Sequence, residues 1–75
     1  MNTMKITDYN YGSGARSVLI NLNRIAFVEA DGRLRLLRAG SAEKAVLHEI
    51  FFTGDLSVSV DEADYRRIAA AMGLK

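Results

Sequence analysis

Cysteine is absent from the sequence, histidine occurs once, and no long apolar run is present. Without cysteine the chain can form neither a disulfide nor a thiolate metal site. The one histidine, His48, cannot supply a multi-histidine zinc site within a single chain. The longest apolar runs span about five residues, as at 68–72, whereas a membrane-spanning helix needs roughly 20. No metal, cofactor or transmembrane helix is therefore expected.

The beginning of the chain lacks the features of a targeting segment. Residues 1–10 show no basic flank followed by an apolar stretch, so no secretory signal is visible. The absence of cysteine allows a reducing compartment. The expected location is the cytoplasm.

The chain is short, at 75 residues, of which 49% are apolar and 25% are charged. This is the composition of a globular protein, and one domain over residues 1–75 is expected, because a chain of this size buries only about 60% of its unfolded surface. A core this small rarely supplies more than about 3 to 5 kcal/mol, so such domains often gain support from a disulfide, a metal or a partner subunit. Once the first two are excluded, self-association remains.

The C-terminal segment carries the clearest signal, that of an amphipathic helix over about residues 62–72. Asp61 is a favourable N-cap residue, and Gly73 stands where a left-handed residue commonly ends a helix. Glu62 and Arg66, four positions apart, are expected to pair. An apolar stripe recurs at helical spacing and must be buried. Its members are Tyr65, Ile68, Ala69 and Met72.

Alternating apolar and polar residues before the helix predict a hairpin with a defined register. Residues 46–52 and 56–60 flank the three-residue connection 53–55, which contains a glycine. The expected opposite pairs are Phe52 with Leu56, Ile50 with Val58, and His48 with Val60.

A second hairpin is predicted at Asp31-Gly32, a dipeptide suited to a type I′ turn, between residues 25–30 and 33–38. Its register pairs Phe27 with Leu36 and Glu29 with Leu34. Upstream, strands are expected at 18–22 and 4–8. The expected interruptions are a kink at 21–24, where asparagine favours local hydrogen bonds, and loops at 10–14 and 39–42.

Together these elements predict an α+β fold: a small, mostly antiparallel sheet of about five strands with the single C-terminal helix packed on one face. The face expected to lie under the helix bears Ile25, Phe27, Leu36, Ile50, Phe52, Val58 and Val60. A helix of about 16 Å covers only part of such a sheet, because it rises about 1.5 Å per residue. The opposite face therefore needs its own explanation.

That opposite face mixes apolar residues with arginine, glutamate and serine, a composition typical of a protein interface. The expected contact residues are Val28, Leu37, Leu47 and Phe51, with Ala26 beside them. An alternative is that the N-terminal segment, with Tyr9 and Tyr11, folds across this face within the monomer.

Two features suggest chemistry, and each has an ordinary explanation. The glycine pair Gly12 and Gly14 before Arg16 is reminiscent of a phosphate loop, but a strand follows in place of a lysine that opens a helix. His48 shares its strand face with Ile50, where a histidine most often satisfies one hydrogen bond at the edge of a core. No serine or pair of carboxylates has a catalytic context. An enzyme is therefore not expected.

Arginine is the most concentrated basic feature, although the net charge is only +1. The arginines that could contact phosphates are Arg24, Arg33, Arg35 and Arg38. The alternative is a solvated strand face whose aliphatic stems cover neighbouring apolar residues. No aromatic residues are interleaved to support base stacking.

Two stretches, residues 18–29 and 50–58, resemble a recurrent bacterial pattern. It consists of a strand, Asn, an apolar residue, Ile, and a strand that ends in Glu, followed later by a strand, Gly and a valine-rich strand before a helix. The flagellar FlbD-like family is similar over most of its short length, and the LytTR-type DNA-binding domain is similar around residues 25–29. The resemblance implies a small bacterial β domain without catalytic residues, and LytTR-type domains would imply DNA contacts by loops and arginines. Residues 33–44 form a longer segment than the FlbD-like pattern has.

The leading hypothesis is therefore a non-enzymatic protein-interaction module that binds itself or another protein. The alternative is a nucleic-acid-binding accessory or regulatory protein that uses the arginine-bearing strand face. A small ligand-binding domain stays open, since a loop across a sheet face can form a pocket.

Overall fold

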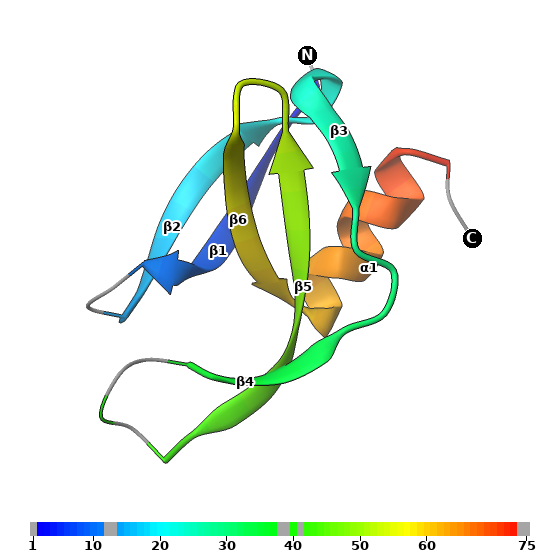
Figure 1. Cartoon of the computed structure of the whole chain (residues 1–75). Coiled ribbons are helices and arrows are strands. Elements are labelled where there is room, and N and C mark those ends of the chain that lie inside the picture. Colours follow the sequence, from blue (N-terminus) through cyan, green and yellow to red (C-terminus); the bar gives the residue numbers. More distant parts are fainter. Residues whose placement is uncertain (1, 12–13, 38–39, 41, 74–75) are drawn as a thin grey trace.

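A computed structural model of the chain describes residues 2–11, 14–37, 40 and 42–73. The described residues form six strands, a short 3-10 helix and one α-helix (Figure 1). In chain order these are β1 Thr3–Tyr11, β2 Gly14–Asn21, η1 Leu22–Arg24, β3 Ile25–Val28, β4 Arg33–Leu36, β5 Lys44–Phe52, β6 Leu56–Asp61 and α1 Glu62–Ala71. The expected α+β class, with antiparallel strands and one C-terminal helix, is confirmed.

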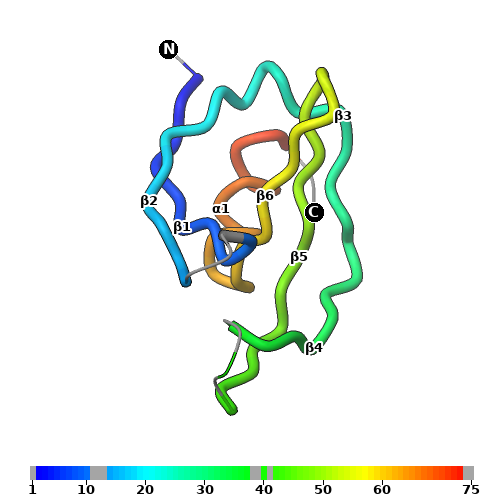
Figure 2. Tube along the Cα trace, turned by 60° about the vertical axis from the view of Figure 1, so that its left-hand side comes forward, coloured from blue at the N-terminus to red at the C-terminus, as the bar shows by residue number. Residues whose placement is uncertain are grey.

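The strands form two sheets and not one. β1 and β2 pair as an antiparallel hairpin, with Ile6 opposite Val18. In the second sheet β5 is central, with β6 on one side and both β3 and β4 on the other. Figure 2 shows β3 and β4 following one another along the same side of β5.

The hairpin predicted at Asp31-Gly32 is wrong. β3 pairs with the C-terminal half of β5, through Val28 opposite Ile50, and β4 pairs with its N-terminal half, through Arg33 opposite Leu47. The chain therefore keeps its direction through 29–32 and forms one interrupted strand beside β5. Pairing with this long neighbour replaces the local turn.

The hairpin predicted at residues 53–55 is confirmed residue by residue. Three of its pairs are Phe52 with Leu56, Ile50 with Val58, and His48 with Val60. Gly54 and Asp55 both have positive φ, at 88° and 63°, which closes the three-residue connection. The signal was local, so the sequence was sufficient to reveal it.

The predicted caps and ion pair of the helix are confirmed, and of the predicted buried stripe Ile68 is buried, whereas Met72 is 37% exposed. The Asp61 carboxylate accepts a hydrogen bond from the Asp64 amide at 2.9 Å, so it is the N-cap. Gly73 follows the helix with φ of 75°. Glu62 and Arg66 pair at 3.4 Å. The kink expected at 21–24 is η1, with an asparagine side chain as its cap.

One buried cluster joins both sheets to the helix, and its members are Ile6, Ile20, Ile50, Val58, Val60 and Ile68. The face expected under the helix is correct for Ile50, Val58 and Val60, and Ile25 and Phe52 pack against the cluster. It is wrong for Phe27 and Leu36, which are 58% and 50% exposed.

A register shift explains why Phe27 lies outside. Between Ile25 and Phe27 the pairing with β5 slips by one residue, so Phe27 lies opposite Phe51 and Val28 lies opposite Ile50. A slip of one residue exchanges the two faces of a strand. Val28 therefore packs against the core, where the sequence predicted Phe27.

The far end of the β4–β5 pair projects beyond the other elements. Figures 1 and 2 both show β4 and the start of β5 extending past the β1–β2 hairpin and past α1. The molecule measures 36 × 23 × 19 Å along its principal axes. We call this projecting part, β4 with residues 44–47 of β5, the β4–β5 ribbon.

Candidate functional site

His48 is buried on β5, with 2% of its surface exposed. Its Nδ1 lies 3.0 Å from the main-chain oxygen of Glu29, and its Nε2 lies 3.1 Å from the carboxylate of Glu62. Its ring stacks on Tyr65 of α1. The side chain thus connects β5, the segment after β3 and the first turn of the helix. A ring enclosed in this way is out of reach of a substrate.

Asp8 on β1 is a second buried polar group, with 1% of its surface exposed. Its Oδ1 accepts hydrogen bonds from the amides of Ser59 at 3.1 Å and Asn10 at 2.9 Å, and its Oδ2 accepts one from Arg16 Nε at 3.4 Å. The Ser59 bond joins the two sheets where β1 meets β6. The Asp8 carboxylate therefore stabilises the packing of the two sheets and is not accessible to solvent.

The four residues expected at an interface do not form one surface. Val28 packs against the core, Leu47 is 3% exposed, and Leu37 is partly buried. Phe51 is partly buried and stacks on Phe27, with ring centroids 4.3 Å apart. On the face that bears Phe51, the stacked rings of Phe27 and Phe51 present an apolar surface, because Phe27 is 58% exposed.

The N-terminal strand lies close to one end of the second sheet. The pKa of the Tyr9 hydroxyl is raised by burial, by the charges of Asp61 and Asp64, and by a hydrogen bond to Asp61. Asp61 lies opposite Leu47 in the β5–β6 register. The β1 strand therefore reaches the end of the sheet where Leu47 is buried.

The expected arginine face is also divided. Arg24 lies at the 53–55 turn, because its main-chain oxygen accepts from the Thr53 amide at 2.9 Å, whereas Arg33 lies opposite Leu47. Leu47 and Thr53 are six positions apart, which corresponds to about 20 Å of extended strand. Arg35 is on β4 beside Arg33, and Arg38 lies outside the described residues.

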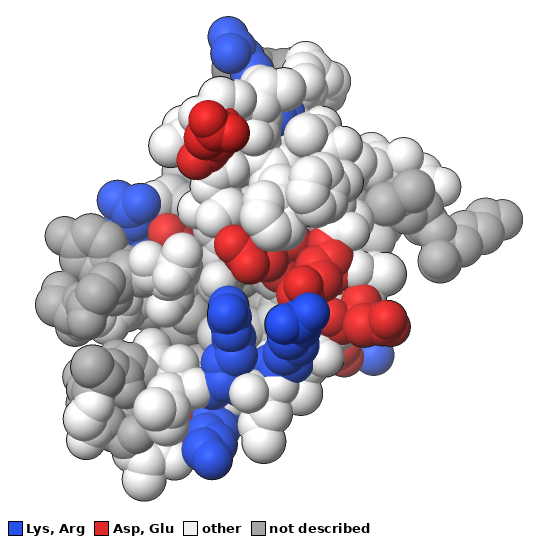
Figure 3. Space-filling view, viewed as in Figure 1, with Lys and Arg blue, Asp and Glu red and all other residues white. Residues whose placement is uncertain are grey.

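The basic residues near β4 are bordered by acidic ones. Arg33 lies 3.8 Å from the Glu29 carboxylate. Figure 3 shows Asp and Glu side chains immediately next to the Lys and Arg side chains over β4 and β5. This surface has mixed charge and is not a continuous basic patch.

A different apolar surface lies on the β4–β5 ribbon. Three apolar side chains project from one side of it: Leu34, Leu36 and Val46, which are 66%, 50% and 42% exposed. Lys44 lies at the border of this side, opposite Leu36. Leu34 lies directly opposite Val46 across the strand pair. We call these three side chains the ribbon face. The periodicity of the sequence predicts Leu36 under the helix, and its exposure contradicts that prediction.

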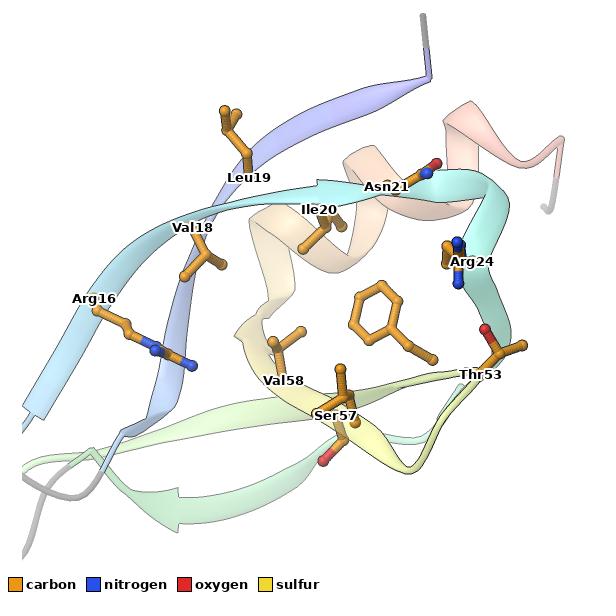
Figure 4. Close-up of a pocket in the computed structure, with 11 residues that line it drawn as sticks. Arg16, Val18, Leu19, Ile20, Asn21, Arg24, Thr53, Ser57 and Val58 are labelled. Atoms are coloured by element: carbon orange, nitrogen blue, oxygen red, sulfur yellow. The ribbon is translucent and has the colours of Figure 1, made fainter.

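A hollow of about 380 Å³ lies between β2, η1 and the β5–β6 hairpin. It is lined by Arg16, Val18, Leu19, Ile20, Asn21, Arg24, Phe52, Thr53, Leu56, Ser57 and Val58. Figure 4 shows the side chains of Val18, Ile20 and Val58 turned toward one another, with Arg16 and Arg24 at opposite ends. No sequence motif marks this hollow, because it depends on the spacing of two sheets.

The part of the chain that the structure describes contains no candidate metal site and no candidate membrane-spanning helix. No group of three or more histidine, aspartate or glutamate side chains is placed to hold a metal ion there. Within the same residues, no helix combines the length and apolar character needed to cross a membrane.

Comparison with known proteins does not assign the chain to a family. No protein-family model matches it, and searches of curated proteins and of solved structures find no match. The resemblance to FlbD-like and LytTR-type domains stays a prediction.

Proposed function

We propose that the chain is a non-enzymatic interaction module that binds a second copy of itself through the ribbon face. The observation that carries this proposal is the exposure of Leu34, Leu36 and Val46 on a part of the molecule that projects from the body. Exposed apolar side chains that gather on one surface commonly mark a site of protein association.

The ribbon face continues the side of β5 that faces the core. Side chains alternate along a strand, so Val46 shares its side with His48 and Ile50. His48 and Ile50 are buried, and Tyr65 of α1 stacks on His48. Among the described residues, nothing gives Val46 equivalent cover, because it is 42% exposed. A second copy would extend the core beyond the helix.

The charges favour stacking of two ribbon faces over pairing of strand edges. Arg33 and Arg35 alternate with Leu34 and Leu36, so they project from the opposite side of β4. Two ribbons can therefore meet face to face about a twofold axis without bringing these arginines together. Antiparallel pairing of two β4 edges would place arginines opposite arginines, which disfavours that arrangement.

The expected dimer is weak. Three side chains per copy are far fewer than the roughly 20–30 residues per side of a standard interface. We therefore expect self-association in the range of roughly tens to hundreds of micromolar. A small core gains from such association, because folding and assembly are then linked.

Sedimentation velocity over this concentration range tests the proposal. The average mass should rise from that of the 8.3 kDa chain toward twice that value. Leu34→Glu should keep the chain monomeric, because it places a charge in the contact. The matched control is Leu19→Glu, since Leu19 is 74% exposed on β2 and lies outside the ribbon. A monomer at all concentrations, or equal association of both variants, would contradict the proposal.

Nucleic-acid binding through arginines stays a prediction without a specific structural observation in its favour. Arg24 lies far from Arg33 and Arg35, and Glu29 borders Arg33. Titration with oligonucleotides at two salt concentrations would test it, because phosphate contacts weaken steeply with salt.

A further inference from the structure

We infer that the hollow between β2 and the β5–β6 hairpin is a binding site for a small amphipathic carboxylate with a medium-length alkyl chain. The inference does not depend on self-association, because none of the three ribbon-face residues lines the hollow. It rests on the walls of the hollow, on its charges and on its size.

The facing walls of the hollow are apolar. Val18 and Ile20 project from β2 toward Val58 of β6 (Figure 4). The strands β2 and β6 belong to different sheets, so no ladder of hydrogen bonds closes the space between them. Ligand sites are commonly clefts of this kind, mostly apolar and largely formed before the ligand binds.

The two sheets are joined at both ends of the hollow. At one end the Asp8 carboxylate of β1 accepts a hydrogen bond from the Ser59 amide of β6 at 3.1 Å. At the other end η1 connects β2 directly to β3, and the Thr53 amide fixes η1 by donating to the Arg24 oxygen at 2.9 Å. These two connections set the spacing between β2 and β6.

An exposed leucine extends the apolar lining to the rim. Leu56 lines the hollow and is 68% exposed. An alkyl chain that lay between β2 and β6 would cover part of this side chain. Burial of apolar surface is the main favourable contribution to such binding.

The charged residues that line the hollow are of one sign. Arg16 and Arg24 line it, and no aspartate or glutamate among the described residues does so. At one end of the hollow, Arg16 Nε lies 3.4 Å from the Asp8 carboxylate. The Arg24 guanidinium makes no hydrogen bond or ion pair with the residues that the structure describes, and Figure 4 shows it at the opposite end. A guanidinium in this position suits a carboxylate, which it can bind with two parallel hydrogen bonds.

The volume sets the size of the ligand. A water molecule occupies about 30 Å³ in the liquid, so a hollow of about 380 Å³ holds roughly a dozen groups of that size. Octanoate has nearly that many non-hydrogen atoms, with a carboxylate at one end and an alkyl chain for the rest. It is therefore the probe of choice.

Titration of the full-length chain with octanoate, followed by amide NMR shifts, tests the inference. Saturable shifts are expected at the lining residues, above all Val18, Ile20, Thr53 and Ser57. Octan-1-ol should bind more weakly, and octyltrimethylammonium should not bind at this site. Arg24→Gln should weaken octanoate binding by about tenfold, the effect of losing one charge-assisted interaction, and leave octan-1-ol unchanged.

The matched control is Arg35→Gln, which removes an exposed cation on β4 and should leave octanoate binding unchanged. Val18→Phe, in a chain whose amide spectrum stays dispersed, should block both octanoate and octan-1-ol. Absence of saturable shifts at the lining residues would overturn the inference. Equal binding of octanoate and octyltrimethylammonium, or equal effects of Arg24→Gln and Arg35→Gln, would overturn it too.

Discussion

The imidazole ring of His48 lies flat against the phenol ring of Tyr65, with centroids 3.9 Å apart and ring planes inclined by 9°. Each ring nitrogen of His48 has an acceptor beside it, the Glu29 main-chain oxygen and the Glu62 carboxylate. One buried side chain thus fixes the helix and the segment after β3 on the central strand.

Replacement of His48 by phenylalanine should separate stacking from hydrogen bonding. The substituted ring can still stack on Tyr65, but the Glu29 oxygen loses its partner. We expect a loss of about 1 to 3 kcal/mol in the free energy of unfolding, measured by urea denaturation. Glu62→Gln should cost less, because Glu62 is 49% exposed and solvent screens its interactions. Equal stability of His48→Phe and the parent chain would show that the two contacts contribute nothing.

Asp8 offers a test of the junction between the sheets. Asp8→Ala leaves the Ser59 amide, in a residue 1% exposed, without its acceptor. The expected loss is about 1 to 3 kcal/mol, because an unsatisfied buried donor costs its full desolvation. Asp8→Asn retains an oxygen at Oδ1 and loses mainly the ion pair with Arg16, whose side chain is 51% exposed, so the loss should be clearly smaller. Urea denaturation of both variants measures the difference, and equal losses would assign the effect to charge.

The raised pKa of Tyr9 leads to a prediction for the free energy of unfolding in alkaline solution. Burial, the charges of Asp61 and Asp64, and a hydrogen bond to Asp61 raise the pKa of the Tyr9 hydroxyl above its usual value of 10.0. Because the folded state favours the neutral phenol, this contribution is complete below the unfolded pKa and is lost as pH rises through the folded pKa. The urea midpoint should therefore fall as pH rises above about 10, and Tyr9→Phe should reduce the fall. An identical pH profile for the variant would contradict this assignment.

The parts of the fold that the sequence predicted correctly have local causes. The N-cap at Asp61 and the connection at 53–55 depend on residues a few positions apart, and both are observed. The segment 25–36 was predicted wrongly because its outcome depends on a distant partner. Pairing with β5 supplies more hydrogen bonds than a two-residue turn, and that gain is invisible in the dipeptide Asp31-Gly32.

The candidate sites were harder to predict for the same reason. A one-residue slip after Ile25 moved Val28 inward and Phe27 outward, which divided the expected interface. The hollow arises from the separation of β2 and β6, and no motif marks the two arginines that flank it. The ribbon face is exposed because α1 does not extend over this part of the sheet. The alternation of leucine and arginine in β4 does not reveal how far the helix extends.

Gly32 is required for a reason other than the turn that the sequence predicted. The sequence suggested a glycine needed for positive φ, but Gly32 is not among the glycines with positive φ. A Cβ atom at this position would collide with Val46 Cγ1 and lie 2.8 Å from His48 Nε2. The glycine is therefore required by the close approach of the backbone to a buried ring.

Gly32→Ala should destabilise the fold by about 1 to 3 kcal/mol, the usual effect of overpacking. Val46 is 42% exposed and can move aside, but His48 is held by Glu29, Glu62 and Tyr65, so the added methyl group must displace the backbone of 29–32. Asp31→Ala is the matched control, because Asp31 is exposed, and it should change the urea midpoint little. In His48→Ala the penalty of Gly32→Ala should shrink, since the ring that obstructs the methyl group is gone. A double-mutant cycle without this coupling would show that the glycine is required for another reason.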